Sequence, residues 1–497
     1  QQQQQQRTPL SPSPLACGAS HCMSAAARQV LGAAFGRRAS AVAGRCWYDH
    51  IVVGAGAAGS VLASRLASEG SRVLLLESGA IPVPVRSNGW RSILTSSSSS
   101  SSAPGHASYG SRSRAAGVWA WGHAEDYDSW AAAAGEPGIW SHEALLPHFR
   151  RSQSKLFPNL PHHRDDAVQK QAFASALRGA GAEEFHAMGE VDVREAYLRP
   201  AIQASGPAGQ RLEVQCNTTV QRVLIEGSLA VGVEWAGGEA RAGEVILCAG
   251  AWASPQLLMH SGIGPREQLE AHGIPVARHS PGVGANFQDH LGFAFTSSGP
   301  RALPEVKLGV GSREHALTGL FSMAGPGSAA PKTSVLGGYA RSSSSSPGLD
   351  LELQLWTSGR DPMLAVHLTR PPASCRGRLE LRRSRVGGAE PRQSSLCLRP
   401  STTTSEVDFD PVHAEESRAL SAGLRLAEAV ARSLHQQNLW PSLPDSLDDK
   451  EILHLLRQGF TTPRGRPSGT CAMGGQADGN SVVDGRLQVY GLQGLRV

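Results

Sequence analysis

Three glycines and one acid carry the clearest chemistry in this chain. Gly54, Gly56 and Gly59 form a G-x-G-x-x-G pattern, and Glu77 follows Gly59 by 18 residues. The first glycine permits a tight turn, the second lets backbone approach a pyrophosphate, and the third allows a helix to pack closely on a sheet. An acid at position 77 can bind the hydroxyl groups of a ribose. The pattern therefore predicts a dinucleotide site, and it disfavours the 2′-phosphate of NADP.

The residues around these glycines must form a strand, a turn, a helix and a second strand. Residues 48–53 predict a short strand that ends in the apolar, β-branched run 51–53, as in a buried parallel strand, and residues 72–76 predict the second strand. The helix between them is expected to bury a stripe of Ala58, Val61, Leu62 and Leu66. The helix would start near Ala57 and Ala58, where its amides and dipole favour a diphosphate.

Length and charge limit the class of protein. A chain of 497 residues can form two domains or one elaborate domain. The net charge of +5 comes from residues 1–48, which hold five arginines and no acid, so the remaining chain is formally neutral and nothing indicates nucleic-acid binding. Residues 1–47 have the Ala-, Arg- and Ser-rich composition of a transit peptide, which predicts a mitochondrion or plastid. A disordered extension without a targeting role is the alternative.

The remaining composition indicates neither a membrane span nor a metal site. No segment has the length and apolarity of a transmembrane helix. The chain contains eight scattered cysteines, Cys17, Cys22, Cys46, Cys216, Cys248, Cys375, Cys397 and Cys471. Because no C-x-x-C pair occurs, we predict no disulfide framework and no metal, and we infer a reducing compartment.

Periodicity predicts further elements downstream. Residues 212–214, 220–225 and 230–235 are expected strands, and residues 244–247 form another that runs into the small residues 248–250. That strand end is a second place where backbone can lie close to a nucleotide. Residues 415–437 predict an amphipathic helix. Its buried face is expected to hold Leu420, Leu424, Ala427, Ala431 and Leu434.

Several motifs resemble the glucose–methanol–choline (GMC) oxidoreductase family, most closely its choline dehydrogenases. The matching segments are HAEDYDSW (123–130), GIWS (138–141), GAWASPQLLMHSGIG (250–264), PGVGANFQDH (281–290), PSGTCAMG (467–474) and VVDGRLQVYGLQGLRV (482–497). The resemblance runs from about residue 48 to the last residue. It implies FAD instead of NAD as the cofactor, and hydride removal from an alcohol carbon to the flavin. Oxygen or a quinone-type compound would then reoxidise the flavin.

The resemblance also implies the architecture. The expected fold is α/β (α+β overall), with a Rossmann-type FAD-binding domain and an interleaved antiparallel-sheet substrate domain. The FAD-binding domain would hold residues 48–152 and 212–290, and the substrate domain residues 153–211 and 291–405. Residues 406–497 would return to the FAD-binding domain. Gly110 and Val118 are implied as further cofactor-binding positions. Val220 would contact the adenine through its backbone, or alternatively is a plain core residue.

The chain departs from the family pattern at functional positions. The family's G-G-S-S-x-x-N segment keeps Gly110 but has lost one glycine and its asparagine, and two arginines have entered. The position of the family's catalytic histidine holds Arg466, whose guanidinium cannot accept a proton at neutral pH. We interpret His290, in the FQDH turn, as structural. The family's second catalytic His or Asn would lie beyond Val497, so we expect the chain to be incomplete.

Two functional hypotheses follow from these observations. The first is an FAD-dependent alcohol dehydrogenase or oxidase, with a small-molecule alcohol as substrate and an unidentified base. The alternative is a flavin-binding homologue with impaired catalysis, or a non-redox lyase of the same family. The identity of the alcohol and the oligomeric state stay open at this point.

Overall fold

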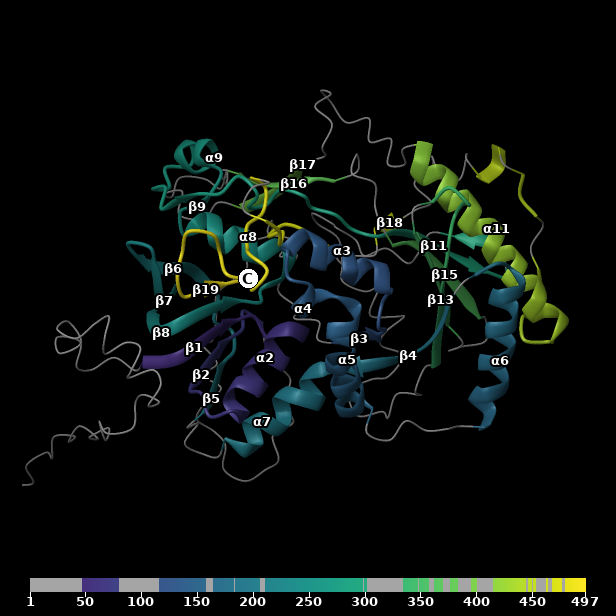
Figure 1. The fold of residues 1–497 in the computed structure, drawn as a ribbon, viewed down its shortest axis with the longest axis horizontal. Coiled ribbons are helices and arrows are strands. Elements are labelled where there is room, and N and C mark those ends of the chain that lie inside the picture. The colour runs from purple at the N-terminus through teal and green to yellow at the C-terminus, as the bar shows by residue number, and fades with distance from the viewer. Residues whose placement is uncertain are drawn as a thin grey trace, which may run out of the picture.

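Two sheets form the body of the protein in a computed structural model (Figure 1). The structure describes residues 47–79, 116–157, 164–205 without 183, 211–301 without 298, 334–356 without 347, 362–369, 376–382, 395–399, 414–452 without 444, 445 and 449, 462–463, 467–475 and 479–497. Gly110, Arg466 and residues 1–46 lie outside the described residues.

The first sheet has the strand order β5-β2-β1-β8-β7-β6, and β19 also pairs with β8. Its strands are β1 (Trp47–Val53), β2 (Val73–Leu76), β5 (Leu212–Gln215), β6 (Val220–Glu226), β7 (Leu229–Trp235), β8 (Gly238–Leu247) and β19 (Leu495–Arg496). Strands β5, β2, β1 and β8 run parallel, whereas β6, β7 and β8 form an antiparallel meander. Parallel strands are covered on both faces and must be apolar throughout. All four residues of β2 are accordingly buried.

Helix α2 (Ala57–Ser68) connects β1 to β2 and packs on the sheet through small residues. The buried residues are Gly59, Ser60, Ala63, Ser64 and Ala67. The predicted stripe was therefore wrong, because Ala58 is exposed and Val61, Leu62 and Leu66 are only half-buried. Glycine and alanine at four-residue spacing let the helix backbone approach the strands closely, so the larger side chains are displaced to the flanks.

The second sheet is antiparallel and has the order β12-β11-β15-β14-β13-β4-β3, with β18 also pairing with β11. Its strands are β3 (Ala116–Trp119), β4 (Glu184–Asp192), β11 (Leu291–Thr296), β12 (Gly299–Arg301), β13 (Ser334–Ala340), β14 (Leu351–Trp356), β15 (Met363–Leu368) and β18 (Thr462–Pro463). Side chains alternate between the two faces along each strand. One face is apolar, with Phe293, Leu353 and Val366 in a core that α6 (Arg164–Gly179) and α11 (Ala414–Gln436) cover.

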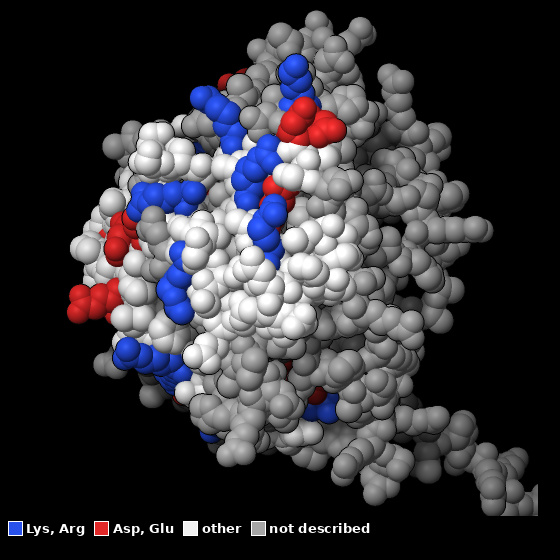
Figure 2. Space-filling view, turned by 90° about the vertical axis from the view of Figure 1, so that its right-hand side faces the viewer, with Lys and Arg blue, Asp and Glu red and all other residues white. Residues whose placement is uncertain are grey.

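Helix α11 confirms the helix predicted from periodicity. Leu420, Leu424 and Leu434 are at most 4% exposed, and the two alanines of the predicted face are fully buried. Helices α6 and α11 lie side by side at one end of the molecule (Figure 1). Figure 2 views this end and shows basic and acidic side chains scattered among neutral ones. This mixed surface is typical of the solvated side of an amphipathic helix.

Shorter elements link the two sheets and extend them. They are α3 (Ala124–Ala134), α4 (Pro137–Trp140), α5 (His142–Leu156), the π-helical turn η2 (Arg194–Leu198), α7 (Arg199–Ala204), β9 (Ile263–Gly264), α9 (Arg266–Ala271), β10 (Arg278–His279), β16 (Arg378–Arg382) and β17 (Ser395–Arg399). Strand β3 pairs with β4 of the antiparallel sheet although it falls in the expected FAD-binding segment, and α11 packs on that sheet although it falls in the expected returning segment. The domain boundaries stay a prediction.

Strand β19 is held to β8 by a charged cluster as well as by its ladder. Arg496 Nε donates to Glu244 Oε1 at 2.6 Å, and His50 Nδ1 lies 3.4 Å from Glu244 Oε2. Burial of the Glu244 carboxyl opposes its ionisation, but the His50 imidazole and the Arg496 guanidinium outweigh that effect and lower its pKa.

Glu244→Gln is expected to lower the free energy of unfolding by about 1–2 kcal/mol at pH 7, because a charge-assisted hydrogen bond is lost. A carboxyl whose pKa is lowered in the folded state stabilises the fold above its ordinary pKa, near 4.5, and loses that contribution as the pH falls through the folded value. Urea denaturation should therefore show the two proteins converging below pH 4.5. Glu234→Gln, in the more exposed pair with Arg222, is the control and should change stability by less than about 1 kcal/mol.

Candidate functional site

The glycine pattern forms the turn between β1 and α2. Gly54 has φ +102°, and a Cβ there would lie 2.5 Å from the carbonyl oxygen of Cys248. A Cβ on Gly59 would lie 1.9 Å from the carbonyl oxygen of Gly54. Only glycine fits either position, because a side chain would collide with backbone that is itself held in the sheet.

The first turn of α2 is open to a ligand. Gly56 is the N-cap residue and provides no side-chain cap, and the first turn contains no acid. A Cβ on Gly56 would meet nothing within 4 Å, and Ala57 and Ala58 are exposed. The first amides of a helix have no partner within the helix, and the dipole places partial positive charge there. These features fit a diphosphate group.

A second strand, turn and helix lie beside the first. Strand β8 pairs parallel with β1 and continues through residues 248–250 into α8 (Gly250–His260), whose N-cap residue Ala249 also provides no side-chain cap. Strand β2, which follows β1 in the chain, pairs with one side of β1, and strand β8 pairs with the other side. Ligands of open α/β sheets bind where the strand order reverses in this way, outside the carboxyl ends of the strands. By this rule a ligand is expected at the sheet edge between the two turns, and we call this place the crevice.

Glu77 lies at the edge of this crevice, directly after β2. Its side chain is 3% exposed. Oε2 accepts from the amide of Ala55 at 2.7 Å, and Oε1 accepts from the amide of Gly79 at 2.8 Å and from the hydroxyl of Ser78 at 3.3 Å. A carboxylate has about four lone-pair positions, so one acceptor position is left for a ribose hydroxyl.

Val220 and Val118, two further predicted cofactor-binding positions, lie within strands. Val220 begins β6, is 7% exposed and packs in the core of the first sheet. Val118 lies in β3 and is paired with Glu190 of β4. Their contacts with a cofactor stay predictions, as does that of Gly110.

The antiparallel sheet presents a second face that the sequence reading did not identify. Ladder pairing places Tyr339, Glu352, His367 and Gly292 side by side across four strands. With Gln354, Trp356 and Thr296 these residues form what we call the seam face. Glu352 and His367 are 6% and 4% exposed, and Gln354 Nε2 donates to Glu352 Oε1 at 2.7 Å. The signal available in the sequence was the alternation of Glu352 and Gln354 within an otherwise apolar strand.

Residues 120–125, which follow β3, pack against the seam face. Ala120 contacts the apolar part of that face, and the rings of His123 and Tyr339 lie 6.3 Å apart. Arg341 and Glu125 form an ion pair at 3.9 Å. We call this contact region the seam.

Two groups near these elements are neutral across the ordinary pH range. Tyr127 of α3 donates its hydroxyl hydrogen to the carbonyl oxygen of Trp121 at 2.5 Å. Burial, helped by the Asp126 charge, raises the pKa of Tyr127 to about 12. Burial likewise raises the pKa of the Cys248 thiol to about 11, so this thiol packs beside the glycine turn as a neutral group.

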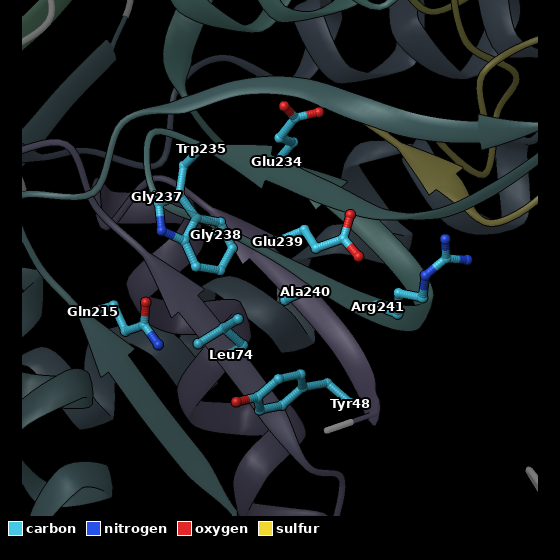
Figure 3. A pocket seen from close by; sticks show the side chains of 10 residues that line it. All are labelled: Tyr48, Leu74, Gln215, Glu234, Trp235, Gly237, Gly238, Glu239, Ala240 and Arg241. Atoms are coloured by element: carbon cyan, nitrogen blue, oxygen red, sulfur yellow. The ribbon is translucent and has the colours of Figure 1, made fainter. Parts of the chain in front are cut away.

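A pocket of about 620 Å³ lies between the sheet and the β7–β8 turn, separate from the glycine turn (Figure 3). Tyr48, Leu74 and Gln215 line it from the parallel strands, and Trp235 lies over Gly238 on the other side. Two of its three charged side chains are held in ion pairs, Arg241 with Glu226 at 2.7 Å and Glu234 with Arg222 at 2.7 Å. We therefore place the functional site at the crevice.

Within the described part of the chain, no helix is long and apolar enough to cross a bilayer. Among the same residues, no three His, Cys, Asp or Glu side chains are grouped where they could hold a metal ion.

Comparisons with known proteins identify the family of this chain. A family model described as "GMC oxidoreductase" matches residues 48–292, and the model of that family's C-terminal part matches residues 378–497. "Choline dehydrogenase, mitochondrial" of Mus musculus is 32% identical over 93% of this chain and 86% of that protein. "Oxygen-dependent choline dehydrogenase" of Stenotrophomonas maltophilia (strain K279a) is 28% identical over 90% of this chain and 89% of that protein.

Solved structures with the same fold include two oxidases. Pyridoxine 4-oxidase from Mesorbium loti superposes with a TM-score of 0.60 at 21% identity, covering 90% of this chain and 93% of its own. Formate oxidase superposes with a TM-score of 0.60 at 20% identity, covering 91% and 93%. At this identity the likeness concerns the fold.

Proposed function

Because the chain belongs to the GMC oxidoreductases, an FAD-dependent family that acts on CH–OH groups, we propose that it oxidises a small alcohol of the choline type. The observation that carries this proposal is the crevice, where two uncapped helices begin at neighbouring strand ends. When bound there, FAD would accept two electrons and a hydrogen from the substrate carbon.

Three groups of this chain would hold the cofactor. The turn at Gly54 and Gly56 brings backbone close to the diphosphate, and the first amides of α2, at Ala57 and Ala58, donate to it. Glu77 supplies the acceptor for the ribose. Val118, Val220 and Gly110 are proposed as further contacts, by resemblance alone.

Anaerobic reduction of the bound flavin tests the proposed function. Full-length protein loaded with FAD is expected to lose the visible absorbance of oxidised flavin when choline or another primary alcohol is added without dioxygen. Admitting oxygen or a quinone should restore the absorbance and identify the acceptor. If no alcohol of a broad panel reduces the flavin, the alternative of a catalytically impaired homologue or a lyase gains support and the alcohol oxidation proposal fails.

We also propose an organelle location, mitochondrion or plastid. Relatives in mouse and human carry "mitochondrial" in their names, and residues 1–48 contain five arginines and no acid. A chain tagged at its C-terminus and followed by cell fractionation should co-purify with the organelle, whereas a chain starting at residue 47 should not.

A further inference from the structure

Alcohol oxidation at the crevice needs a group that takes the hydroxyl proton. Several described groups near the seam are unsuited to this task. Tyr127 holds its proton and already donates it to a carbonyl. Arg341 cannot lose its charge. Glu352 and His367 are at least 94% buried within the antiparallel sheet, which leaves little room for a substrate to reach them.

His290 lies where the crevice meets the antiparallel sheet. The strand-like stretch before it runs beside residues 468–470, since Gly284 donates to the carbonyl of Thr470 at 2.9 Å and Gln288 exchanges backbone bonds with Ser468. Thr470 in turn donates its hydroxyl hydrogen to the carbonyl of Ala251, in the first turn of α8, at 2.7 Å. One residue after His290, β11 begins and pairs with β15 and β18.

The hydrogen bond of His290 to a carbonyl determines which ring nitrogen carries hydrogen when the imidazole is neutral. Nδ1 lies 2.7 Å from the carbonyl oxygen of Leu368 on β15. A carbonyl can only accept, so Nδ1 carries the hydrogen and Nε2 carries the lone pair. No described group bonds Nε2, and the side chain is half-buried, so the ring is oriented but reachable. The backbone amide of His290 donates to Asp289 Oδ1 at 2.7 Å, which fixes the residue further.

We propose that His290 Nε2 is the proton acceptor of this chain, an inference that rests on the proposed alcohol oxidation. The O–H bond of the alcohol breaks and its proton goes to Nε2. When bound, FAD would accept the hydrogen of the carbon that bears the hydroxyl, together with two electrons, as hydride. The product is an aldehyde, and the imidazolium returns its proton to solvent.

His290→Asn separates this role from a structural one. The Asn amide can donate to the Leu368 carbonyl as Nδ1 does, but it has no basic nitrogen at the position of Nε2. We expect the rate of anaerobic flavin reduction to fall by about 10²–10⁴-fold, with FAD content and unfolding temperature unchanged. His290→Gln should show the same loss, and it keeps the test valid if the Asn variant folds poorly.

His435 offers a matched control. Its Nδ1 makes the same contact with the carbonyl oxygen of Trp440, at 2.7 Å, but it ends α11 on the far side of the antiparallel sheet. His435→Asn should therefore reduce the flavin at the rate of the parent protein. Equal rates in the His290→Asn variant and the parent protein would overturn the inference while leaving the proposed function in place.

The pH profile is a second readout of the role. Other titratable groups of this region are Asp289 beside His290, His367 and Glu352 on the seam face, and His123 and Glu125 across the seam. An imidazole accepts the proton only while Nε2 is unprotonated, so the reduction rate should fall at acid pH. This fall of the rate at acid pH should be absent in the His290→Asn variant. If the fall persists in that variant, one of the other groups causes it and not His290.

A labelling measurement works without any turnover. Diethylpyrocarbonate modifies neutral, accessible imidazole nitrogens, and peptide mass mapping locates the product. Loading the protein with FAD should protect His290 and leave the labelling of His435 unchanged. If FAD protects neither residue, His290 does not face the cofactor and the inference fails even where the parent protein is active. If FAD protects His290 in the parent protein but no alcohol reduces the bound flavin, the proposed function fails instead.

Discussion

Gly54→Ala is expected to abolish flavin loading and to lower the free energy of unfolding by about 3–5 kcal/mol. The residue has φ +102°, which costs an L-amino acid backbone strain, and the added Cβ would lie 2.5 Å from the carbonyl oxygen and 2.8 Å from the carbonyl carbon of Cys248. Strands β1 and β8 would have to move apart to relieve this overlap, and both helix starts of the crevice would be displaced. Flavin content after purification and urea denaturation measure the two effects.

Gly56→Ala is the matched control, two residues away in the same turn. Gly56 has φ −68° and its Cβ would meet nothing within 4 Å, so the free protein should be as stable as the parent. The open space is where we place the diphosphate. FAD should therefore bind at least about tenfold more weakly, a loss of about 1.4 kcal/mol. If Gly56→Ala binds FAD with unchanged affinity, the diphosphate does not lie over this turn.

Glu77→Ala is expected to cost about 3 kcal/mol of stability and nearly all FAD affinity. The carboxylate is buried and accepts from the amides of Ala55 and Gly79, and each buried donor left without a partner costs about 1–3 kcal/mol. The same substitution removes the proposed ribose acceptor. Thermal unfolding with and without added FAD separates the two losses, because a ligand that binds only the folded state raises the midpoint.

Glu213→Gln provides the comparison for this variant. Glu213 lies on the neighbouring strand β5 and accepts from the hydroxyl of Tyr48 at 2.7 Å, a bond that a Gln carbonyl can retain. It should change stability by less than about 1 kcal/mol and leave FAD binding intact. A Glu77→Ala protein that is destabilised but still binds FAD as tightly as its parent would show that Glu77 only supports the loop.

Periodic and local features of the fold were predictable from the sequence. Helix α11 buries the five predicted side chains because a long apolar stripe has only one low-energy orientation on a sheet. Strands β1 and β2 were predictable because an apolar run between glycine turns fits a doubly covered parallel sheet. In both cases the burial of the side chains follows from the local order of apolar residues along the chain.

Features that depend on distant pairing were not predictable. The stripe of α2 was misread because close approach to the sheet favours Gly59, Ala63 and Ala67 over the larger residues that a hydrophobicity pattern selects. The seam face depends on which residues stand opposite one another in four strands, and sequence spacing does not fix that register. The bond between His290 and the Leu368 carbonyl likewise joins positions 78 residues apart.

The pairing of β19 with β8 also has a consequence during synthesis of the protein. Arg496 and Glu244 are 252 positions apart, and the ribosome adds roughly 5–20 residues per second, so β8 waits roughly 13–50 s for its partner strand to be made. During that interval one edge of the crevice is uncovered and its apolar residues can meet other unfinished chains. Chaperone occupancy should therefore be high on nascent chains that have completed β8 but not β19.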